Sequence, residues 1–157
     1  MAEIVFYLNG TTAAWTGSPT ERLLDVLRNE FFDTGVKCGC REGECGACSV
    51  ILDGKLANSC IVAMGRAAGS EVITITGYKK TDRFMALDRA FASAGAVQCG
   101  FCTPGMILAA ECLLRKNPHP AEMDIRAGIS GNLCRCTGYN AIVKAISAAA
   151  QEGEGLW

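Results

Sequence analysis

Histidine, basic charge and long apolar runs are all scarce in this sequence of 157 residues. Its single histidine, His119, excludes zinc fingers with two histidine ligands and catalytic zinc sites with several. Fifteen basic residues against sixteen acidic ones give a net charge of -1, whereas a protein that binds nucleic acid through its phosphates needs a basic excess. No apolar run approaches the roughly 20 residues of a membrane span. A globular protein remains, because half of the residues are hydrophobic and 20% are charged.

Cysteine, by contrast, is abundant, with ten in the chain. Five disulfides would indicate secretion. Residues 1–8 (MAEIVFYL) contain no basic segment, however, and Asn9-Gly10 interrupts the apolar run too early for a signal peptide. We therefore expect a cytoplasmic protein, in which clustered cysteines more often bind metal than form disulfides.

The first half of the chain, residues 1–76, predicts a small mixed sheet crossed by one helix. Alternating apolar residues and turn dipeptides predict strands at 3–8, 11–15, 49–52, 55–57 and 72–75. Ser18, Pro19 and Glu21 match the start of a helix, with serine as N-cap, proline at the first helical position and glutamate closing a capping box. That helix should run to about Phe31 and pack on the sheet.

Beyond residue 76 the strand pattern stops. Residues 77–82 are polar and predict a linker. Helical segments follow at 83–94, 103–116, 121–129 and 139–151, which together predict a small helical bundle. The expected fold class is therefore α+β, with one domain at 1–76 and an all-α domain at 83–157, each carrying its own set of cysteines.

The first set has the spacing of a plant-type [2Fe–2S] site. Cys40, Cys45 and Cys48 form C-x4-C-x2-C, and eleven residues separate Cys48 from Cys60. Soft thiolates retain iron, and four of them complete two tetrahedral irons that share bridging sulfides. The alternative is a four-cysteine zinc site, but zinc loops usually show two C-x2-C knuckles, which this half lacks.

The second set is less diagnostic by spacing alone. Cys99 and Cys102 form C-x2-C at the start of one expected helix, and Cys134 and Cys136 form C-x-C before another. Helix N-termini present positive dipole ends and free N–H groups, which suit a negatively charged cluster. Zinc could also use these ligands. The neighbouring ferredoxin-like domain favours iron, because two clusters in series conduct electrons.

The two remaining cysteines are expected to be bystanders. Cys38 lies two residues before the first set, and its use as a ligand would break the x4 spacing. Cys112 falls among leucines in an expected helix, as a core thiol does.

Three motifs resemble the iron–sulfur subunit of the xanthine dehydrogenase (molybdenum hydroxylase) family. They are residues 39–48 (GCREGECGAC), 98–105 (QCGFCTPG) and 131–139 (GNLCRCTGY), and the resemblance covers the chain from its first strand to about residue 150. Cys38 departs from the pattern, because relatives commonly carry another residue there.

The resemblance implies a β-grasp [2Fe–2S] domain followed by a four-helix domain with a second [2Fe–2S] cluster. It places Cys40, Cys45, Cys48 and Cys60 on a cluster near FAD. It places Cys99, Cys102, Cys134 and Cys136 on a cluster near the molybdenum. It also implies that Gln98 and Cys136 contact the molybdopterin.

The chain has no room for molybdenum or flavin domains, so the resemblance implies a small subunit beside a large molybdopterin-binding subunit and a medium FAD-binding subunit, arranged as a dimer of heterotrimers. The implied reaction is hydroxylation of a carbon centre with water as oxygen source. This subunit would do no bond chemistry and would pass electrons one at a time from molybdenum to FAD. Purines are the default substrates, and nicotinate-like heterocycles, aldehydes and aromatic CoA thioesters remain open. The alternatives are a free-standing two-cluster ferredoxin and a zinc-stabilised interaction module.

Overall fold

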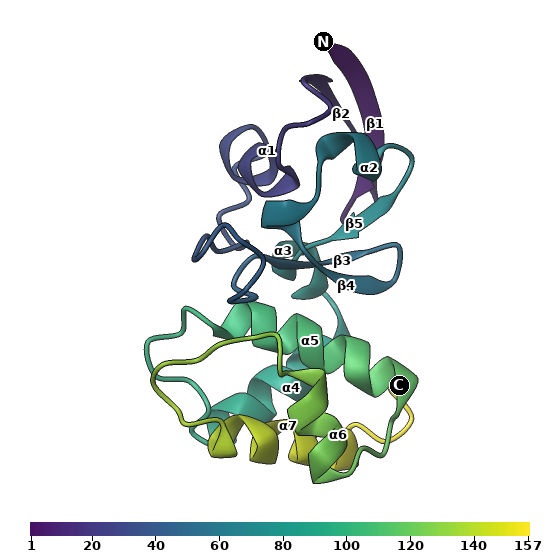
Figure 1. The fold of residues 1–157 in the computed structure, drawn as a ribbon. Coiled ribbons are helices and arrows are strands. Elements are labelled where there is room, and N and C mark those ends of the chain that lie inside the picture. Colours follow the sequence, from purple (N-terminus) through teal and green to yellow (C-terminus); the bar gives the residue numbers. More distant parts are fainter.

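A five-stranded sheet lies above a layer of helices in the computed structural model, which describes residues 1–157 (Figure 1). The strands are β1 (Ala2–Leu8), β2 (Thr11–Gly17), β3 (Ser49–Leu52), β4 (Lys55–Asn58) and β5 (Glu71–Ile73). Their order is β2-β1-β5-β3-β4, with β1 parallel to β5 and the other neighbours antiparallel. Three short helices accompany the sheet: α1 (Leu23–Asn29), α2 (Met64–Ala67) and α3 (Ile75–Tyr78). The expected α+β class is confirmed.

The two expected hairpins are confirmed because their sequence signals are local. In β1, Ile4 and Phe6 are buried while Val5 and Tyr7 are exposed, which is the alternation of a strand with one face on the core. At the β1–β2 turn Asn9 and Gly10 have φ of 53° and 79°, the left-handed conformations that this dipeptide tolerates.

The predicted start of the first helix is wrong. Ser18 to Glu21 form a turn, in which the Glu21 N–H donates to the Ser18 carbonyl at 2.9 Å, and α1 begins only at Leu23. The intervening backbone instead pairs with a distant segment, because Leu23 N–H donates to the Val62 carbonyl and Met64 N–H to the Glu21 carbonyl. A capping pattern cannot reveal this long-range pairing, which leaves α1 with seven residues instead of a long helix.

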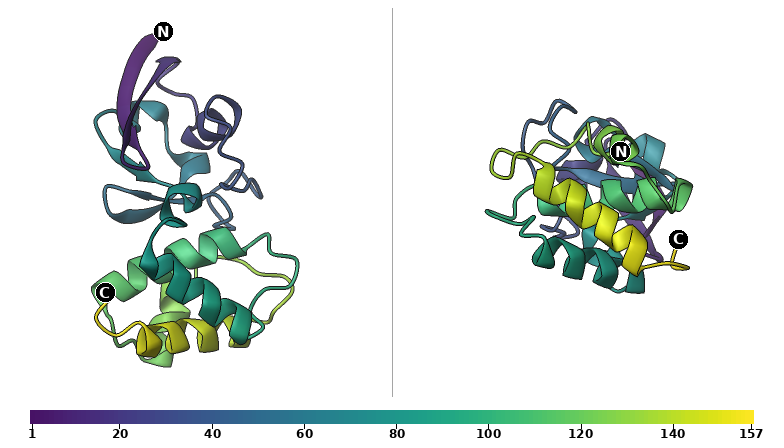
Figure 2. Two further views of the ribbon diagram at one scale, coloured as in Figure 1. Left: turned by 180° about the vertical axis from the view of Figure 1, so that it is seen from behind. Right: turned by 90° about the horizontal axis from the view of Figure 1, so that it is seen from below.

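The four expected helices of the second half are present. They are α4 (Asp82–Ser93), α5 (Thr103–Lys116), α6 (Glu122–Gly128) and α7 (Asn140–Glu152). Helix α5 contacts β3 and β4 above it and α4 and α6 beside and below it, and α4 packs along α7 (Figures 1 and 2). Residues 105–112 of α5 are all buried, as expected for a helix covered on every side. Cys112 is one of them and lies in the core, as predicted.

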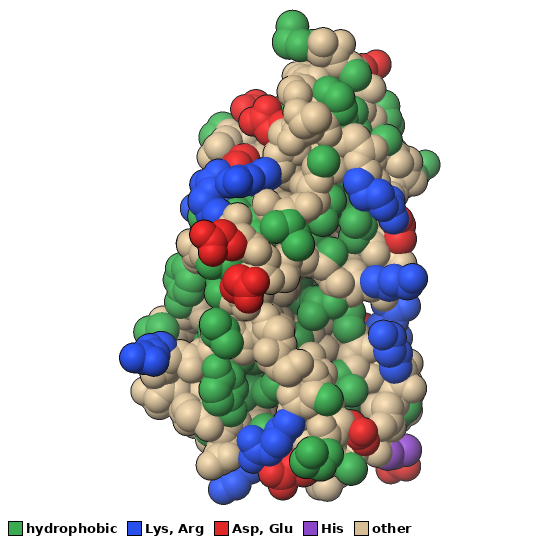
Figure 3. Space-filling model, in the orientation of Figure 1, with side chains coloured by type: hydrophobic (Ala, Val, Ile, Leu, Met, Phe, Trp, Pro, Cys, Tyr) green, Lys and Arg blue, Asp and Glu red, His purple; other side chains and the backbone are tan.

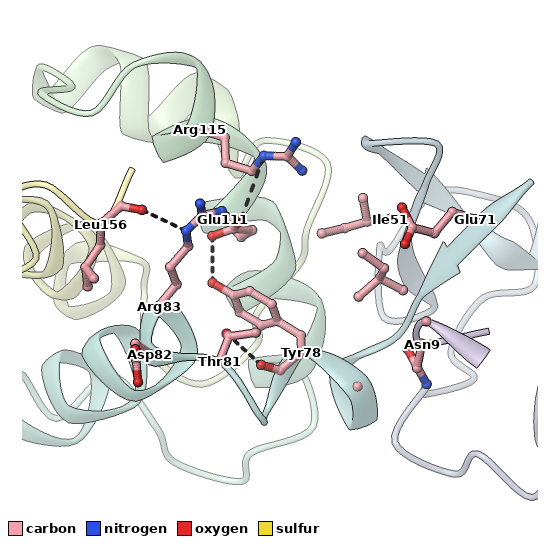
Figure 4. Close-up of a pocket in the computed structure, with 13 residues that line it drawn as sticks. Asn9, Ile51, Glu71, Tyr78, Thr81, Asp82, Arg83, Glu111, Arg115 and Leu156 are labelled. Atoms are coloured by element: carbon pink, nitrogen blue, oxygen red, sulfur yellow. Dashed lines mark hydrogen bonds and ion pairs between the residues drawn. The ribbon is translucent and has the colours of Figure 1, made fainter. Parts of the chain in front are cut away.

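The sheet and the helices share a packed boundary. Ile51 of β3 and Ile75 of α3 belong to the same buried cluster as Leu108 of α5. Tyr78 was expected in a polar linker, but it is only 4% exposed and its hydroxyl donates to the Glu111 carboxylate at 2.7 Å (Figure 4). An aromatic residue among polar neighbours carries no periodic signal, and its burial rests on Glu111 and on the ring of Phe84, which it meets edge to face.

Glu111 is the centre of a buried polar cluster beside a cavity of about 630 Å³ between the two layers (Figure 4). Its carboxylate accepts hydrogen bonds from Tyr78, from Arg83 at 2.9 Å and from Trp157 at 2.7 Å. Burial, and then the hydrogen bond to Glu111, raises the pKa of Tyr78. This cluster joins α3, α4, α5 and the C-terminal residues. None of the helices is long and apolar enough to cross a membrane.

Candidate metal centres

The loop at residues 35–48 curls around the Cys40 sulfur. The backbone N–H groups of Glu42, Glu44 and Cys45 point to the Cys40 Sγ at 3.4, 3.3 and 3.4 Å, and the Cys40 N–H points to the Cys45 Sγ at 3.4 Å. The hydrogen bonds from Glu42, Cys45 and Glu44 lower the pKa of Cys40 to about 6, because they stabilise the thiolate. The loop is therefore shaped for an anionic sulfur.

Positive φ angles allow this loop to turn so tightly. Arg41, Gly43 and Gly46 have φ of 62°, 80° and 69°. The non-glycine residue among them, Arg41, is held by both oxygens of Asp25 at 2.7 and 2.6 Å, which fastens the loop to α1. Its guanidinium also lies 3.8 Å from the Cys38 Sγ, so the fifth thiol faces a cation beside the loop.

The β3–β4 hairpin brings the other two thiols of the first set together. Cys48 directly precedes β3 and Cys60 lies in the 3-10 turn Ser59–Ile61 that follows β4. Both are 2% exposed, and the Ser59 hydroxyl donates to the Cys48 carbonyl at 2.7 Å. Burial, then the hydrogen bond to the Cys48 thiol, raises the pKa of Cys60 to about 12, and the charge of Cys40 adds to this effect. The structure thus places the predicted residues in two pairs, Cys40 with Cys45 and Cys48 with Cys60.

The second set is also assembled as two pairs. The Cys99 and Cys136 sulfurs are 3.6 Å apart, and the Cys134 thiol is close enough to Cys102 to affect its pKa. Burial and the neighbouring Cys134 raise the pKa of Cys102 to about 12. Cys102 directly precedes α5, as expected, whereas α7 begins only at Asn140, after a turn.

Hydroxyl groups surround the second set, and sequence reasoning missed them. The Thr137 hydroxyl donates to the Cys134 Sγ at 3.1 Å. Burial raises the pKa of Cys134, but the Thr137 hydroxyl and N–H outweigh it and lower the value to about 7. The hydroxyl of Thr103, next to Cys102, is buried without a hydrogen-bond partner. An unpaired buried donor in the residue that follows Cys102 fits a negatively charged sulfur cluster.

The second set opens to the surface. Cys99 and Cys136 are exposed, and the Gln98 amide donates to the Cys136 carbonyl at 3.2 Å. The two residues predicted to contact molybdopterin therefore lie together. Three exposed apolar residues flank the thiols in sequence: Val97, Phe101 and Leu133. Hydrophobic side chains gather on this loop side of the molecule in the space-filling view (Figure 3).

The two thiol sets are connected by a direct hydrogen bond. The N–H of Leu133, the residue before Cys134, donates to the carbonyl of Cys45 at 2.9 Å. Beside it, the side-chain amide of Asn132 donates to the Gly46 carbonyl at 3.1 Å and contacts the Ser49 hydroxyl at 3.2 Å. None of these contacts has a local sequence signal, although all five residues lie in the cysteine motifs or directly beside them.

Comparison with known proteins gives matches along the whole chain. A 2Fe-2S iron-sulfur cluster binding domain matches residues 6–70, and a [2Fe-2S] binding domain matches residues 74–147. The small FeS subunit of nicotinate dehydrogenase from Eubacterium barkeri is 49% identical over 144 residues, which cover 92% of each chain. The iron-sulfur-binding subunit of xanthine dehydrogenase from Escherichia coli O157:H7 is 42% identical over 141 residues, which cover 88% of each chain. This chain belongs to the iron–sulfur subunits of the molybdenum hydroxylase family.

A solved structure agrees with this membership. The aldehyde oxidoreductase from Desulfovibrio desulfuricans ATCC 27774 has a TM-score of 0.92 and 41% identity over 99% of this chain, which corresponds to 17% of that longer chain. Each family model of the iron–sulfur subunit spans one of the two thiol sets, so the subunit carries two [2Fe–2S] clusters. The donor set fits them, because each site offers four soft thiols and nearby N–H or hydroxyl groups that can stabilise sulfur charge.

Replacing Gly46 of the iron–sulfur subunit with alanine tests the contact between the loops. A Cβ at Gly46 would lie 2.4 Å from the Gly131 carbonyl oxygen, whereas one at Gly69, which has a similar φ of 67°, would meet nothing within 4 Å. Gly69→Ala should therefore lower the free energy of unfolding only by about 1–2 kcal/mol, the cost of placing alanine in the left-handed conformation. Gly46→Ala should cost about 1–3 kcal/mol more through overpacking. The measurement is the thermal midpoint of the cluster-loaded variants, and equal losses for both would contradict the contact.

Proposed function

We propose that this chain is the electron-transfer subunit of a molybdenum-dependent hydroxylase, carrying electrons one at a time from a molybdopterin site through two [2Fe–2S] clusters to FAD on a partner subunit. The observation that carries the proposal is the hydrogen bond from Leu133 to Cys45, which joins the two thiol sets. When bound, the clusters supply reversible one-electron oxidation and reduction. The chain itself contributes position, hydrogen bonds and burial, and it is not the site of bond chemistry on the substrate.

We assign the ligands as the pairs in which the thiols lie. Cys40 with Cys45, and Cys48 with Cys60, would hold the first cluster, and Cys99 with Cys136, and Cys102 with Cys134, the second. Two thiols for each of two irons is the ligand count of a [2Fe–2S] site. The donors to Cys40 and Cys134 would stabilise the negative charge of each cluster. In this proposal each cluster has its own domain: residues 1–76 hold the first cluster, residues 83–157 hold the second, and residues 77–82 link the two.

Exposure, together with the family resemblance, supports a direction of transfer. Cys99 and Cys136 lie at the surface with Gln98, so this end would face the molybdopterin, and the Cys40 loop would face FAD. The exposed apolar residues of this surface, Val97, Phe101 and Leu133, favour a permanent partner over a free-standing ferredoxin. The assembly would be a cytoplasmic dimer of heterotrimers with a large molybdopterin-binding subunit and a medium FAD-binding subunit.

The substrate would be a purine or another N-heterocycle. This choice rests on relatives that are named as nicotinate dehydrogenase and xanthine dehydrogenase subunits. The substrate would bind in the large subunit, so no residue of this chain would select it.

Native mass spectrometry of the assembly, combined with metal analysis, tests the proposal. A complex of this subunit with two larger chains that contain molybdenum and FAD is the expected result. Purification of this chain alone, with both clusters and full redox activity, would favour the free-standing ferredoxin instead.

Gln98→Ala tests the side of the subunit that receives electrons. Loss of the Gln98 amide removes its hydrogen bond to the Cys136 carbonyl and its proposed contact with molybdopterin. One neutral hydrogen bond contributes about 1 kcal/mol of interaction free energy. Reduction of the clusters by the assembly's substrate should slow by roughly fivefold, while reduction by dithionite stays unchanged. Stopped-flow absorbance measures both rates, with Gln151→Ala on α7 as a control. Equal slowing by both reductants would argue against a role at the molybdopterin side.

A further inference from the structure

Asn132 occupies the point where the two cluster loops meet. Asn132 lies in the segment between α6 and α7, and only 3% of the residue is exposed. The amide nitrogen donates to the Gly46 carbonyl at 3.1 Å and lies 3.2 Å from the Ser49 hydroxyl, which itself donates to the Gly46 carbonyl at 2.7 Å. One amide group of the helical half is thus bonded to the loop that carries Cys45 and Cys48.

Glycines leave room for this amide and for nothing larger. A Cβ at Gly46 would lie 2.6 Å from the Asn132 Nδ2, and one at Gly105 would lie 2.9 Å from it. The same Cβ at Gly105 would be 2.5 Å from the Gly46 carbonyl oxygen. The backbones of the loop and of α5 therefore approach as closely as glycine permits, and Asn132 fills the space that remains.

The position of Asn132 determines that of its neighbour. The backbone N–H of Asn132 donates to the Ile129 carbonyl at 2.9 Å, and the next N–H, that of Leu133, donates to the Cys45 carbonyl at 2.9 Å. Because hydrogen bonds hold both the backbone and the side chain of Asn132, the peptide group between Asn132 and Leu133 has little freedom to move. The hydrogen bond between the two thiol sets is therefore held by an anchor one residue away.

We propose that Asn132 is a positioning residue for electron transfer between the two clusters, which it serves by locking the Leu133–Cys45 hydrogen bond. The inference rests on the proposed electron-transfer function. The Asn132 side chain forms no hydrogen bond with any of the proposed ligand thiols. Loss of its amide should therefore leave the ligands in place. Transfer between the sites should be impaired instead, because electron tunnelling slows steeply when a bonded contact opens.

The test compares Asn132→Leu, which keeps the size of the side chain and removes its donors, with the native chain in the complete assembly. The control is Asn117→Leu, since the side chain of Asn117 donates to Asp124 and accepts from the His119 N–H, outside both cysteine sets. Iron content and the reduction potential of each cluster report whether the sites survive. Freeze-quench EPR after mixing with substrate measures the delay between reduction of the second and the first cluster, and the magnetic splitting between the two reduced clusters reports their coupling.

We expect Asn132→Leu to retain both clusters and their potentials, to weaken the splitting and to slow transfer between the clusters several-fold, because an opened contact lengthens the tunnelling path. An unchanged transfer rate would overturn the proposal. So would a rate that falls only in proportion to lost iron, which would mean a purely structural role.

Ser49→Ala serves as a second variant if Asn132→Leu does not fold. It removes one partner of the amide and keeps the Gly46 carbonyl, so transfer should slow by less than in Asn132→Leu, with both clusters intact. No change in its rate would then overturn the proposal. Failure of the proposed function looks different, because the native assembly itself would then show no successive reduction of two clusters.

Discussion

Cys136→Ser is expected to remove one of the two cluster EPR signals and to halve the iron of the subunit. Cys136 pairs with Cys99 at 3.6 Å, and serine offers a harder oxygen donor in place of a soft thiolate. The second cluster should therefore be lost. Reduction of the first cluster by substrate should then slow by at least about 100-fold, because second-sphere changes alone cost 10–100-fold at metal sites. Iron analysis and EPR of the substrate-reduced assembly measure both effects.

Two cysteines outside the proposed ligand sets provide the controls. Cys38→Ser changes a thiol that faces Arg41 beside the first loop, and Cys112→Ser changes a thiol in the helical core. Both variants should keep two EPR signals, although the second should be less stable. Two full signals in Cys136→Ser, or the loss of one in Cys38→Ser, would require a different ligand assignment.

Glu111→Leu is expected to destabilise the subunit strongly. The substitution leaves Arg83 without its ion pair and Tyr78 and Trp157 without their acceptor. Removing one partner of a buried ion pair costs about 3–5 kcal/mol. We expect the lower end, about 3 kcal/mol, because the Arg83 side chain is 39% exposed and regains water. The thermal midpoint should fall by roughly 6–12 °C at 2–4 °C per kcal/mol.

A surface ion pair on a neighbouring helix is the matched control for Glu111→Leu. Glu122 pairs with Arg126 at 2.8 Å on α6, but its side chain is 65% exposed. Glu122→Leu should therefore shift the free energy of unfolding by no more than about 0.5 kcal/mol. Similar shifts in the two variants would show that the Glu111 cluster does not hold the layers together.

The sequence predicts those features that have local signals. The two hairpins, the loop at 35–48 and the four helices of the second half all follow from turn dipeptides, glycine-rich spacing or a helical period, and the structure has them. Within the predicted sets, thiols that are distant in sequence lie in pairs, Cys48 with Cys60 and Cys99 with Cys136, and the full ligand sets stay a prediction. Local pattern and tertiary structure agree at these places, which is the usual property of foldable sequences.

The features that the sequence did not reveal depend on partners far along the chain. The turn at Ser18 replaces a helix because Glu21 and Leu23 pair with residues near 63. Tyr78 is buried because Glu111, 33 positions later, accepts its hydroxyl. The Asn132 contact with Gly46 spans 86 positions. Such pairings have no period, so the structure is needed to find them.

The central claim is that this chain holds two [2Fe–2S] clusters in series, and the most direct test is to count iron and acid-labile sulfide in assembly purified without oxygen. Two clusters predict four irons and four sulfides per copy of this subunit, with two EPR signals that substrate reduces one after the other. One zinc for each cysteine set, with no labile sulfide and no EPR signal after dithionite, would contradict the account.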